Sequence, residues 1–129
     1  MAGTKSVHDD VLDAAFNRIK TDTNFANKMT IVSNACTNYT EANSTYKLAE
    51  IAMTSGDYTI ANGDVSGRKV TVATKSSVPV TTQGSANGVC LVATTDTKLL
   101  YQTTCTTQTI YTTSTVNVQQ WDIEIADPS

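Results

Sequence analysis

The stretch YQTTCTTQTIYTTSTVNVQQW, residues 101–121, contains no Asp, Glu, Lys, Arg or His, and Thr occupies eight of its 21 positions. Thr favours β-strands and brings hydroxyl groups without the desolvation cost of a charge. Exposed strands normally carry charge, which keeps them from pairing with other chains. Two arrangements explain this composition: the stretch supplies two inner strands of a monomer, or it lies partly in an interface between subunits. We favour the interface, since strand edges are safe once they are paired in a symmetric oligomer.

Strand signals recur along the rest of the chain. Alternating or β-branched runs bounded by turn residues predict strands at residues 28–35, 57–64, 67–74, 89–95, 98–106 and 111–127. In the last run the apolar parity changes between Val118 and Trp121, so a β-bulge or a bend between two sheets is expected at Gln119–Gln120. Short strands separated by turn signals predict a mainly β fold, either a β-sandwich or a jelly-roll-like barrel.

One N-terminal amphipathic helix is expected, over about residues 9–20. Its apolar side chains recur at helical spacing and form one stripe: Val11, Leu12, Ala15, Phe16 and Ile19. Asp9 or Asp10 is placed to cap the first turn. Because a helix this short is unstable alone, we expect the stripe to lie on a sheet.

Two segments give weaker signals. Residues 39–53 fit no single period and are interpreted as a loop or a short helical turn. Residues 76–88 contain Pro79, which a central strand does not tolerate, so this segment is predicted to be an edge strand or a connection.

Composition predicts one domain and excludes several classes of protein. The 129 residues suit a single domain, residues 9–129, preceded by a flexible arm of residues 1–8. Only 16% of the residues are charged and the net charge is −3, so no partnership with nucleic acid is expected. No apolar run approaches the roughly 20 residues of a membrane span. The N-terminal residues also lack the apolar core of a signal peptide, so export by the general secretory route is not expected.

The sequence contains no recognisable set of catalytic or metal-binding residues. His8 is the only histidine, which argues against nucleophile–histidine pairs and transition-metal clusters. The segment GDVSGRK, residues 63–69, lacks the spacing of a phosphate-binding loop and is better explained as a tight turn. Four acidic residues are compatible either with a calcium site or with turn formation, and we favour turn formation: Asp57, Asp64, Asp122 and Glu124. We therefore expect neither enzymatic activity nor a cofactor.

Aromatic residues near the end of the chain allow two interpretations. Trp121, Tyr101 and Tyr111 are able to form an exposed platform for a sugar, or Trp121 fills the core of the sandwich. Exposure of Trp121 distinguishes the two, because a binding platform must face solvent.

Three cysteines, Cys36, Cys90 and Cys105, show no metal-binding spacing. The first interpretation is three buried or half-buried thiols. The second is a disulfide between Cys90 and Cys105, which stand opposite each other if their strands form a hairpin that turns at Thr97–Lys98. A register shift of one residue would put the two thiols on opposite faces.

Three segments together resemble a group of small virion structural proteins of tailed bacteriophages and prophages. They are VLDAAFNRIK at 11–20, YTIANGDVSGRKVTVAT at 58–74 and VQQWDIEIADPS at 118–129. The resemblance covers most of the chain in the same order and carries over no catalytic residues. It implies a non-enzymatic component of the virion that is assembled in the cytoplasm of the host bacterium.

Within that group, the resemblance favours a capsid decoration (cement) protein that binds the outer capsid surface and stabilises the head. The alternatives are a neck, collar or tail accessory protein, and a module that binds glycans or the host surface. The expected partners are the major capsid protein or other virion proteins, together with copies of the chain itself, preferentially as a homotrimer. The arm is the expected contact with these partners: Met1, Ala2, Gly3, Thr4, Lys5, Ser6, Val7 and His8.

Overall fold

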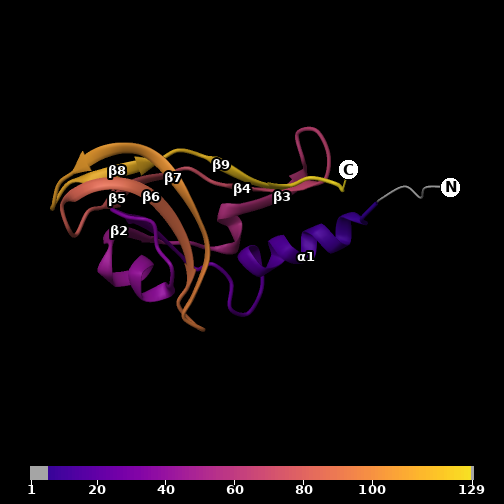
Figure 1. The fold of residues 1–129 in the computed structure, drawn as a ribbon, viewed down its shortest axis with the longest axis horizontal. Helices are drawn as coiled ribbons and strands as arrows, with labels where there is room; N and C mark the ends of the chain where they lie inside the picture. The colour runs from indigo at the N-terminus through magenta and orange to yellow at the C-terminus, as the bar shows by residue number, and fades with distance from the viewer. Residues whose placement is uncertain (1–5, 129) are drawn as a thin grey trace.

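The computed structural model of the protein describes residues 6–128. It contains one α-helix, a short π-helix, a short 3-10 helix and nine strands (Figure 1). The helices are α1 (Asp9–Lys20), η1 (Glu41–Thr45) and η2 (Ser55–Asp57). The strands are β1 (Lys28–Val32), β2 (Lys47–Ala52), β3 (Tyr58–Asn62), β4 (Arg68–Val72), β5 (Lys75–Pro79), β6 (Gly84–Ala93), β7 (Lys98–Ile110), β8 (Thr115–Val118) and β9 (Trp121–Ile125).

The strands form three antiparallel sheets with the orders β2-β1-β6-β7, β3-β4-β9 and β5-β8. Because β4 leads directly into β5 and β8 into β9, the two smaller sheets are two parts of one bent ribbon (Figure 1). The larger sheet and the β5-β8 part curve around a shared apolar interior. The predicted mainly β, sandwich-like fold with one N-terminal helix is confirmed.

Helix α1 lies on the three-stranded sheet, as its apolar stripe predicts. It buries Leu12, Phe16 and Ile19, and it contacts β3 and β4. The cap differs from the expectation, because the Asp10 N–H donates to His8 Nδ1 (3.1 Å) and His8 is therefore the N-cap residue. The Arg68 guanidinium of β4 donates to the Asp13 carboxylate of the helix at 2.7 Å. Among the described residues, no helix has the length and apolar character needed to cross a membrane.

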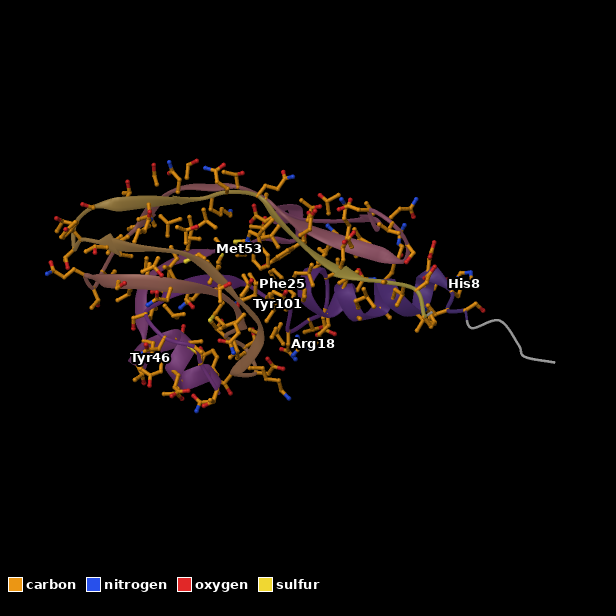
Figure 2. All side chains as sticks on the ribbon, turned by 45° about the horizontal axis from the view of Figure 1, so that its top comes forward. His8, Arg18, Phe25, Tyr46, Met53 and Tyr101 are labelled. Carbon is orange, nitrogen blue, oxygen red and sulfur yellow. The ribbon has the colours of Figure 1, made fainter. Side chains whose placement is uncertain are left out.

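The main core cluster lies where the helix, the three-stranded sheet and the larger sheet meet. Phe25, Met53 and Tyr101 surround this meeting point near the middle of the molecule (Figure 2). Tyr58 is fully buried there, and its hydroxyl donates to the Ala26 carbonyl oxygen at 2.6 Å. Burial, and to a lesser extent the nearby Asp57 charge, raises the pKa of Tyr58, so this phenol stays neutral and keeps its hydrogen bond.

The segment 39–53 is more ordered than the sequence predicts. The short helical turn is confirmed as η1, but β2 follows it at Lys47–Ala52 and pairs with β1. Leu48 and Ala49 are neighbours in the sequence and both are buried, so the strand has an apolar residue on each face at that point. Alternation is lost for this reason, and the period-2 signal of a strand is absent. Strand β6 also begins earlier than predicted, at Gly84.

The expected change of sheet at Gln119–Gln120 is confirmed. β8 ends at Val118 on β5, and β9 begins at Trp121 on β4. The Gln120 N–H donates to Thr74 Oγ1 at 3.0 Å, which ties this bend to the matching bend between β4 and β5. Pro79 ends β5, whose one partner strand among the described residues is β8, in agreement with an edge position.

Candidate functional site

The uncharged stretch 101–121 lies on the open side of the sandwich. Within the described part of the chain, β7 pairs with β6 alone, β8 with β5 alone and β9 with β4 alone, so each has one free edge. Most side chains of β7 are exposed or half-buried. The alternative that this stretch supplies two inner strands is therefore wrong. In the single chain the stretch is a pair of edges joined by a turn at 111–114.

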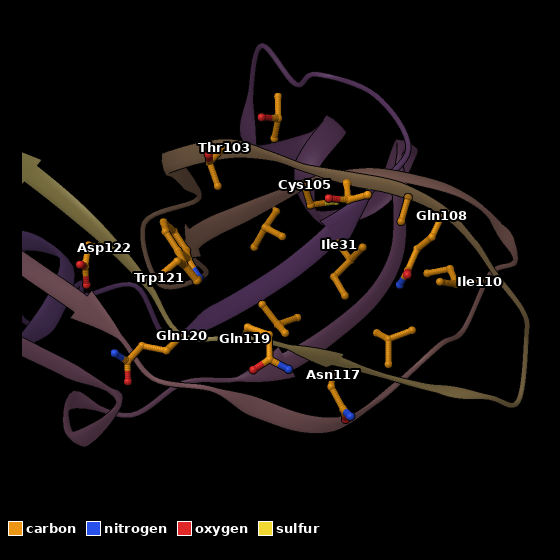
Figure 3. Close-up of a pocket in the computed structure, with 16 residues that line it drawn as sticks. Ile31, Thr103, Cys105, Gln108, Ile110, Asn117, Gln119, Gln120, Trp121 and Asp122 are labelled. Atoms are coloured by element: carbon orange, nitrogen blue, oxygen red, sulfur yellow. The ribbon is translucent and has the colours of Figure 1, made fainter.

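Between these edges is a cavity of about 440 Å³, which we call the β7–β8 slot (Figure 3). β7 forms one wall, and the segment 116–122 of β8 and β9 forms the other. The buried side chains of the lining come from β1, β6 and the end of β7: Ile31, Ala86, Val89 and Ile110. The slot therefore reaches the apolar interior of the sandwich from the side that the two sheets leave open.

The polar lining of the slot is almost entirely neutral. Its polar side chains are Thr103, Thr104, Cys105, Thr106, Gln108, Asn117, Gln119 and Gln120. Asp122 is the one charged residue in the lining, and its carboxylate already accepts hydrogen bonds from Thr71 Oγ1 (2.8 Å) and Lys69 Nζ (3.5 Å). The site has donors and acceptors but no free charge, which suits a neutral occupant.

Trp121 stands at one end of the slot. Its ring stacks on Tyr101 with the ring centres 5.7 Å apart and the planes inclined by 25°. The indole Nε1 is buried without a hydrogen-bond partner, and Figure 3 shows it on the side of the ring that faces the slot. Trp121 is half-buried and packs against the main core cluster. Tyr111 is 58% exposed in the turn after β7, so the three aromatic residues do not form one platform.

Three of the four acidic residues considered as a calcium site lie close together, and two of them contact one lysine. Lys69 Nζ lies 2.8 Å from an Asp64 oxygen and 3.5 Å from an Asp122 oxygen, while Glu124 accepts the Asp64 N–H. Asp57 lies elsewhere and is paired with Lys75 at 2.9 Å. Among the described residues there is no group of His, Cys, Asp and Glu able to hold a metal ion. The Lys69 ammonium group, and not a metal ion, neutralises the Asp64 and Asp122 carboxylates in this structure.

The segment GDVSGRK forms the turn between β3 and β4, in agreement with the prediction. The Gly63 N–H donates to the Gly67 carbonyl at 2.9 Å, and Gly67 has a φ of +71°. Both cations of the segment are already bound, Arg68 to Asp13 and Lys69 to Asp64. The side chains that could attract a phosphate are thus engaged within the chain.

The cysteines are free thiols, with Cys36 and Cys90 buried and Cys105 half-buried, as the first interpretation expects. The alternative disulfide is wrong, because the hairpin register pairs Cys90 with Gln102 rather than with Cys105. Cys105 is three residues further along β7 than Gln102 and so points to the opposite face. Burial raises the pKa of Cys90 to about 12, which keeps this thiol protonated at neutral pH.

The arm, Met1–His8, falls mostly outside the described residues, which begin at Ser6. Ser6 and His8 are exposed and Val7 is half-buried. The predicted contact through this arm stays a prediction.

Within residues 6–128, the slot combines a cavity, free backbone edges and an unpaired buried donor. Sequence analysis identified its strands through their lack of charge but did not predict the slot, which depends on how far β7 and β8 diverge after the turn. Comparisons with protein-family models, with curated proteins and with solved structures gave no match.

Proposed function

We propose that the protein is a non-enzymatic structural component of a tailed-bacteriophage virion, a decoration protein that binds the outer capsid surface and stabilises the head. The observation that carries the proposal is the exposed, uncharged edge of β7. This strand is 13 residues long, and it carries no charged side chain after Lys98. On a monomer such an edge promotes aggregation, because its free N–H and C=O groups can pair with other chains. On a subunit of an assembly the same edge can be covered by a neighbouring subunit.

The segments that carry the virion resemblance support the proposal as a structural unit. They form α1, the β3–β4 hairpin and β9, which are far apart in the sequence but pack together, with β4 paired to both β3 and β9. The resemblance therefore concerns a complete helix-on-sheet module rather than scattered residues. The β7–β8 slot lies beside this module.

The mechanism would be mechanical. Each copy that buries surface on two neighbouring capsid subunits adds to the free energy needed to separate them, because it binds only the assembled state. A stable contact of this kind buries on the order of 1,200–2,000 Å² in total. A homotrimer at a three-fold position of the capsid would contact several subunits at once and would add avidity.

The test is the copy number of this chain in purified virions relative to the major capsid protein, measured by quantitative mass spectrometry. A ratio near one, or a simple fraction of one, is expected for a protein that decorates the capsid lattice. About a dozen copies per particle would instead indicate a neck or tail accessory protein. Absence from the particle would overturn the proposal.

The arm is proposed as a second contact with the capsid or with a neighbouring copy. Deletion of residues 1–8 is expected to keep the fold and to weaken binding to particles that lack the protein. Helix α1 begins at Asp9, so a second deletion that retains the cap residue His8 separates loss of the arm from loss of the helix cap. Full binding by both truncated proteins would contradict this role.

A further inference from the structure

We propose that the β7–β8 slot binds a single extended, uncharged polypeptide strand, which adds to the free edge of β7. The inference deepens the proposed function and rests on it for the source of the strand, a segment of the virion protein that this chain decorates. The slot itself rests on the geometry alone.

The two ends of the larger sheet are treated differently. At the β2 end, the N–H groups of Thr81 and Thr82 donate to the Leu48 carbonyl at 2.9 and 3.1 Å, and Val80 forms a bridge with Ala49. The chain thus covers that edge with its own backbone. At the β7 end, the described residues provide no strand partner beyond β6. An open edge offers a row of N–H and C=O groups that an incoming strand can pair with.

The dimensions of the slot suit a short strand. The β7 wall runs from Thr103 to Ile110, and six residues of an extended chain span roughly 20 Å at about 3.3 Å per residue. Alternate side chains of such a strand would point inward, onto buried Ile31, Val89 and Ile110. Because strands bound the slot on both sides, a strand already paired within another sheet cannot enter. The occupant is therefore a free extended segment and not the sheet edge of a second copy.

Charge selects among such segments. The lining holds one carboxylate, Asp122, which is bound to Thr71 and Lys69. A charged side chain entering the slot would lose its hydration without gaining a partner of opposite charge. Thr, Gln and Asn side chains on both walls can instead satisfy backbone groups and neutral polar side chains. The lining of the slot therefore fits an uncharged strand with apolar residues at alternate positions.

The unpaired donor at the end of the slot also favours a backbone. Trp121 Nε1 is buried without a partner and faces the interior of the slot. A buried N–H group is normally satisfied, so each exception calls for an explanation. A carbonyl oxygen of a bound strand is an acceptor of the right kind, and every residue of an extended segment carries one.

The experiment uses the full chain and the synthetic peptide acetyl-TVTVTVT-amide as the probe. Since Trp121 is the only tryptophan, its emission reports directly on the end of the slot. Binding is expected to shift this emission and to slow amide hydrogen exchange at those residues within 103–108 whose N–H groups face the free edge of β7. Thr106→Lys, in the slot wall, is expected to weaken binding at least tenfold. Thr109→Lys on the same strand lies outside the lining and is expected to leave it unchanged.

The slot can also be blocked chemically, without an amino-acid substitution. Cys105 lines the slot and is half-buried, whereas Cys36 and Cys90 are buried. Alkylation of the folded protein with N-ethylmaleimide is therefore expected to modify Cys105 first and to abolish peptide binding. Retained binding after complete modification of Cys105 would overturn the proposed location.

Four other outcomes overturn the proposal. Equal binding of a peptide with Pro at alternate positions would show that backbone pairing plays no part, because Pro has no N–H. A shift of the Trp121 emission with maltose but not with the peptide would make the slot a sugar site. Binding of the chain's own residues 1–8 in place of the probe would make the occupant the arm of a second copy. No binding of the probe at 1 mM would leave the slot without this role.

The peptide test and the virion copy number fail independently. A lattice-like copy number with no peptide binding would retain the decoration role and would place its contact elsewhere. Peptide binding by a protein absent from virions would retain the slot and remove its proposed partner.

Discussion

Two halves of the molecule differ in the charge carried by their long strands. In the helix half, made of α1, β3, β4 and β9, the cations of the sheet are paired with carboxylates from distant segments. Arg68 lies 2.7 Å from Asp13 and Lys69 lies 3.5 Å from Asp122. In the slot half, made of β1, β2 and β5–β8, ion pairs are found on β1, β2 and β5. The run from Leu99 through Val118, which carries the open edges, has no charged residue at all.

This difference in charge matches a difference in how the backbone of each half is covered. In the helix half, α1 covers one face of the sheet, and ion pairs join segments far apart in sequence and fix their register. In the slot half, β7 and β8 each keep a free edge, and a charge there would hinder pairing with another strand. Charged side chains are thus present on the sheet that α1 covers and absent along the free edges of β8 and of β7 after Lys98.

The largest effect is expected from the packing that closes the helix half. Phe16 of α1 is 2% exposed and lies in the main core cluster. Phe16→Ala is expected to lower the free energy of unfolding by about 3–5 kcal/mol, measured by urea unfolding. Val11→Ala, on the same helix at a residue that is 61% exposed, is the matched control and should change it by less than about 0.5 kcal/mol. Similar values for both variants would mean that α1 is not part of the core.

The next largest effect is expected at the β3–β4 turn. Gly67 has a φ of +71°, and a Cβ there would lie 1.9 Å from the Ile125 carbonyl oxygen of β9. Gly67→Ala is expected to cost about 1–3 kcal/mol from the backbone conformation alone, with the collision adding to it. Gly56→Ala, where the nearest atom lies at an ordinary 3.7 Å, is the control. Equal melting temperatures for the two variants would contradict the close β4–β9 contact.

The sequence predicts the two halves unequally well. The helix, the β3–β4 hairpin and the change of sheet at Gln119–Gln120 all follow from local periodicity and turn residues. Strand β2 was missed because Leu48 and Ala49 are both buried, which removes the alternation that marks a strand. The alternative register of the β6–β7 hairpin, which would have placed Cys90 opposite Cys105, is also wrong. The turn lies at 94–97 rather than at Thr97–Lys98, and an irregularity between Leu91 and Val92 shifts the pairing further.

The slot was unpredictable for a related reason. Its strands are recognisable by their lack of charge, but the slot exists only because β7 and β8 diverge after a tight turn and pair with different sheets. The buried residues that line it come from β1 and β6, which precede it by many residues. Such long-range placement depends on the whole sheet order and not on any one segment.

A smaller effect is expected from acid. Asp57 accepts hydrogen bonds from Lys75 (2.9 Å) and the Thr54 N–H (2.7 Å). Burial opposes its ionisation, but these hydrogen bonds outweigh burial and lower its pKa below the ordinary value of 3.8. The folded state therefore binds this proton less readily than the unfolded state. The stabilisation is complete above about pH 4 and is lost as the pH falls through the lowered pKa.

Urea unfolding between pH 2.5 and 7 tests whether the contribution of Asp57 to stability falls as the pH is lowered. Asp57→Asn is expected to cost about 1 kcal/mol at pH 7 and to flatten the decline of stability below pH 4. Asp127→Asn, at an exposed residue, provides the control and should keep the wild-type profile. A steeper acid decline in Asp57→Asn than in the wild type would show that the carboxylate is not stabilised in the folded state.

The smallest effect is the one that best tests the comparison between the halves. Thr106 is exposed on β7, so Thr106→Lys is expected to change the free energy of unfolding of the free chain by no more than about 0.5 kcal/mol. Thermal unfolding of the two proteins at equal concentration measures it. If the lysine strongly destabilises the chain, the absence of charge on β7 is a requirement of folding. If stability is unchanged while strand binding is lost, folding does not require β7 to be uncharged. The lack of charge on β7 then matters for the binding of another chain to its edge.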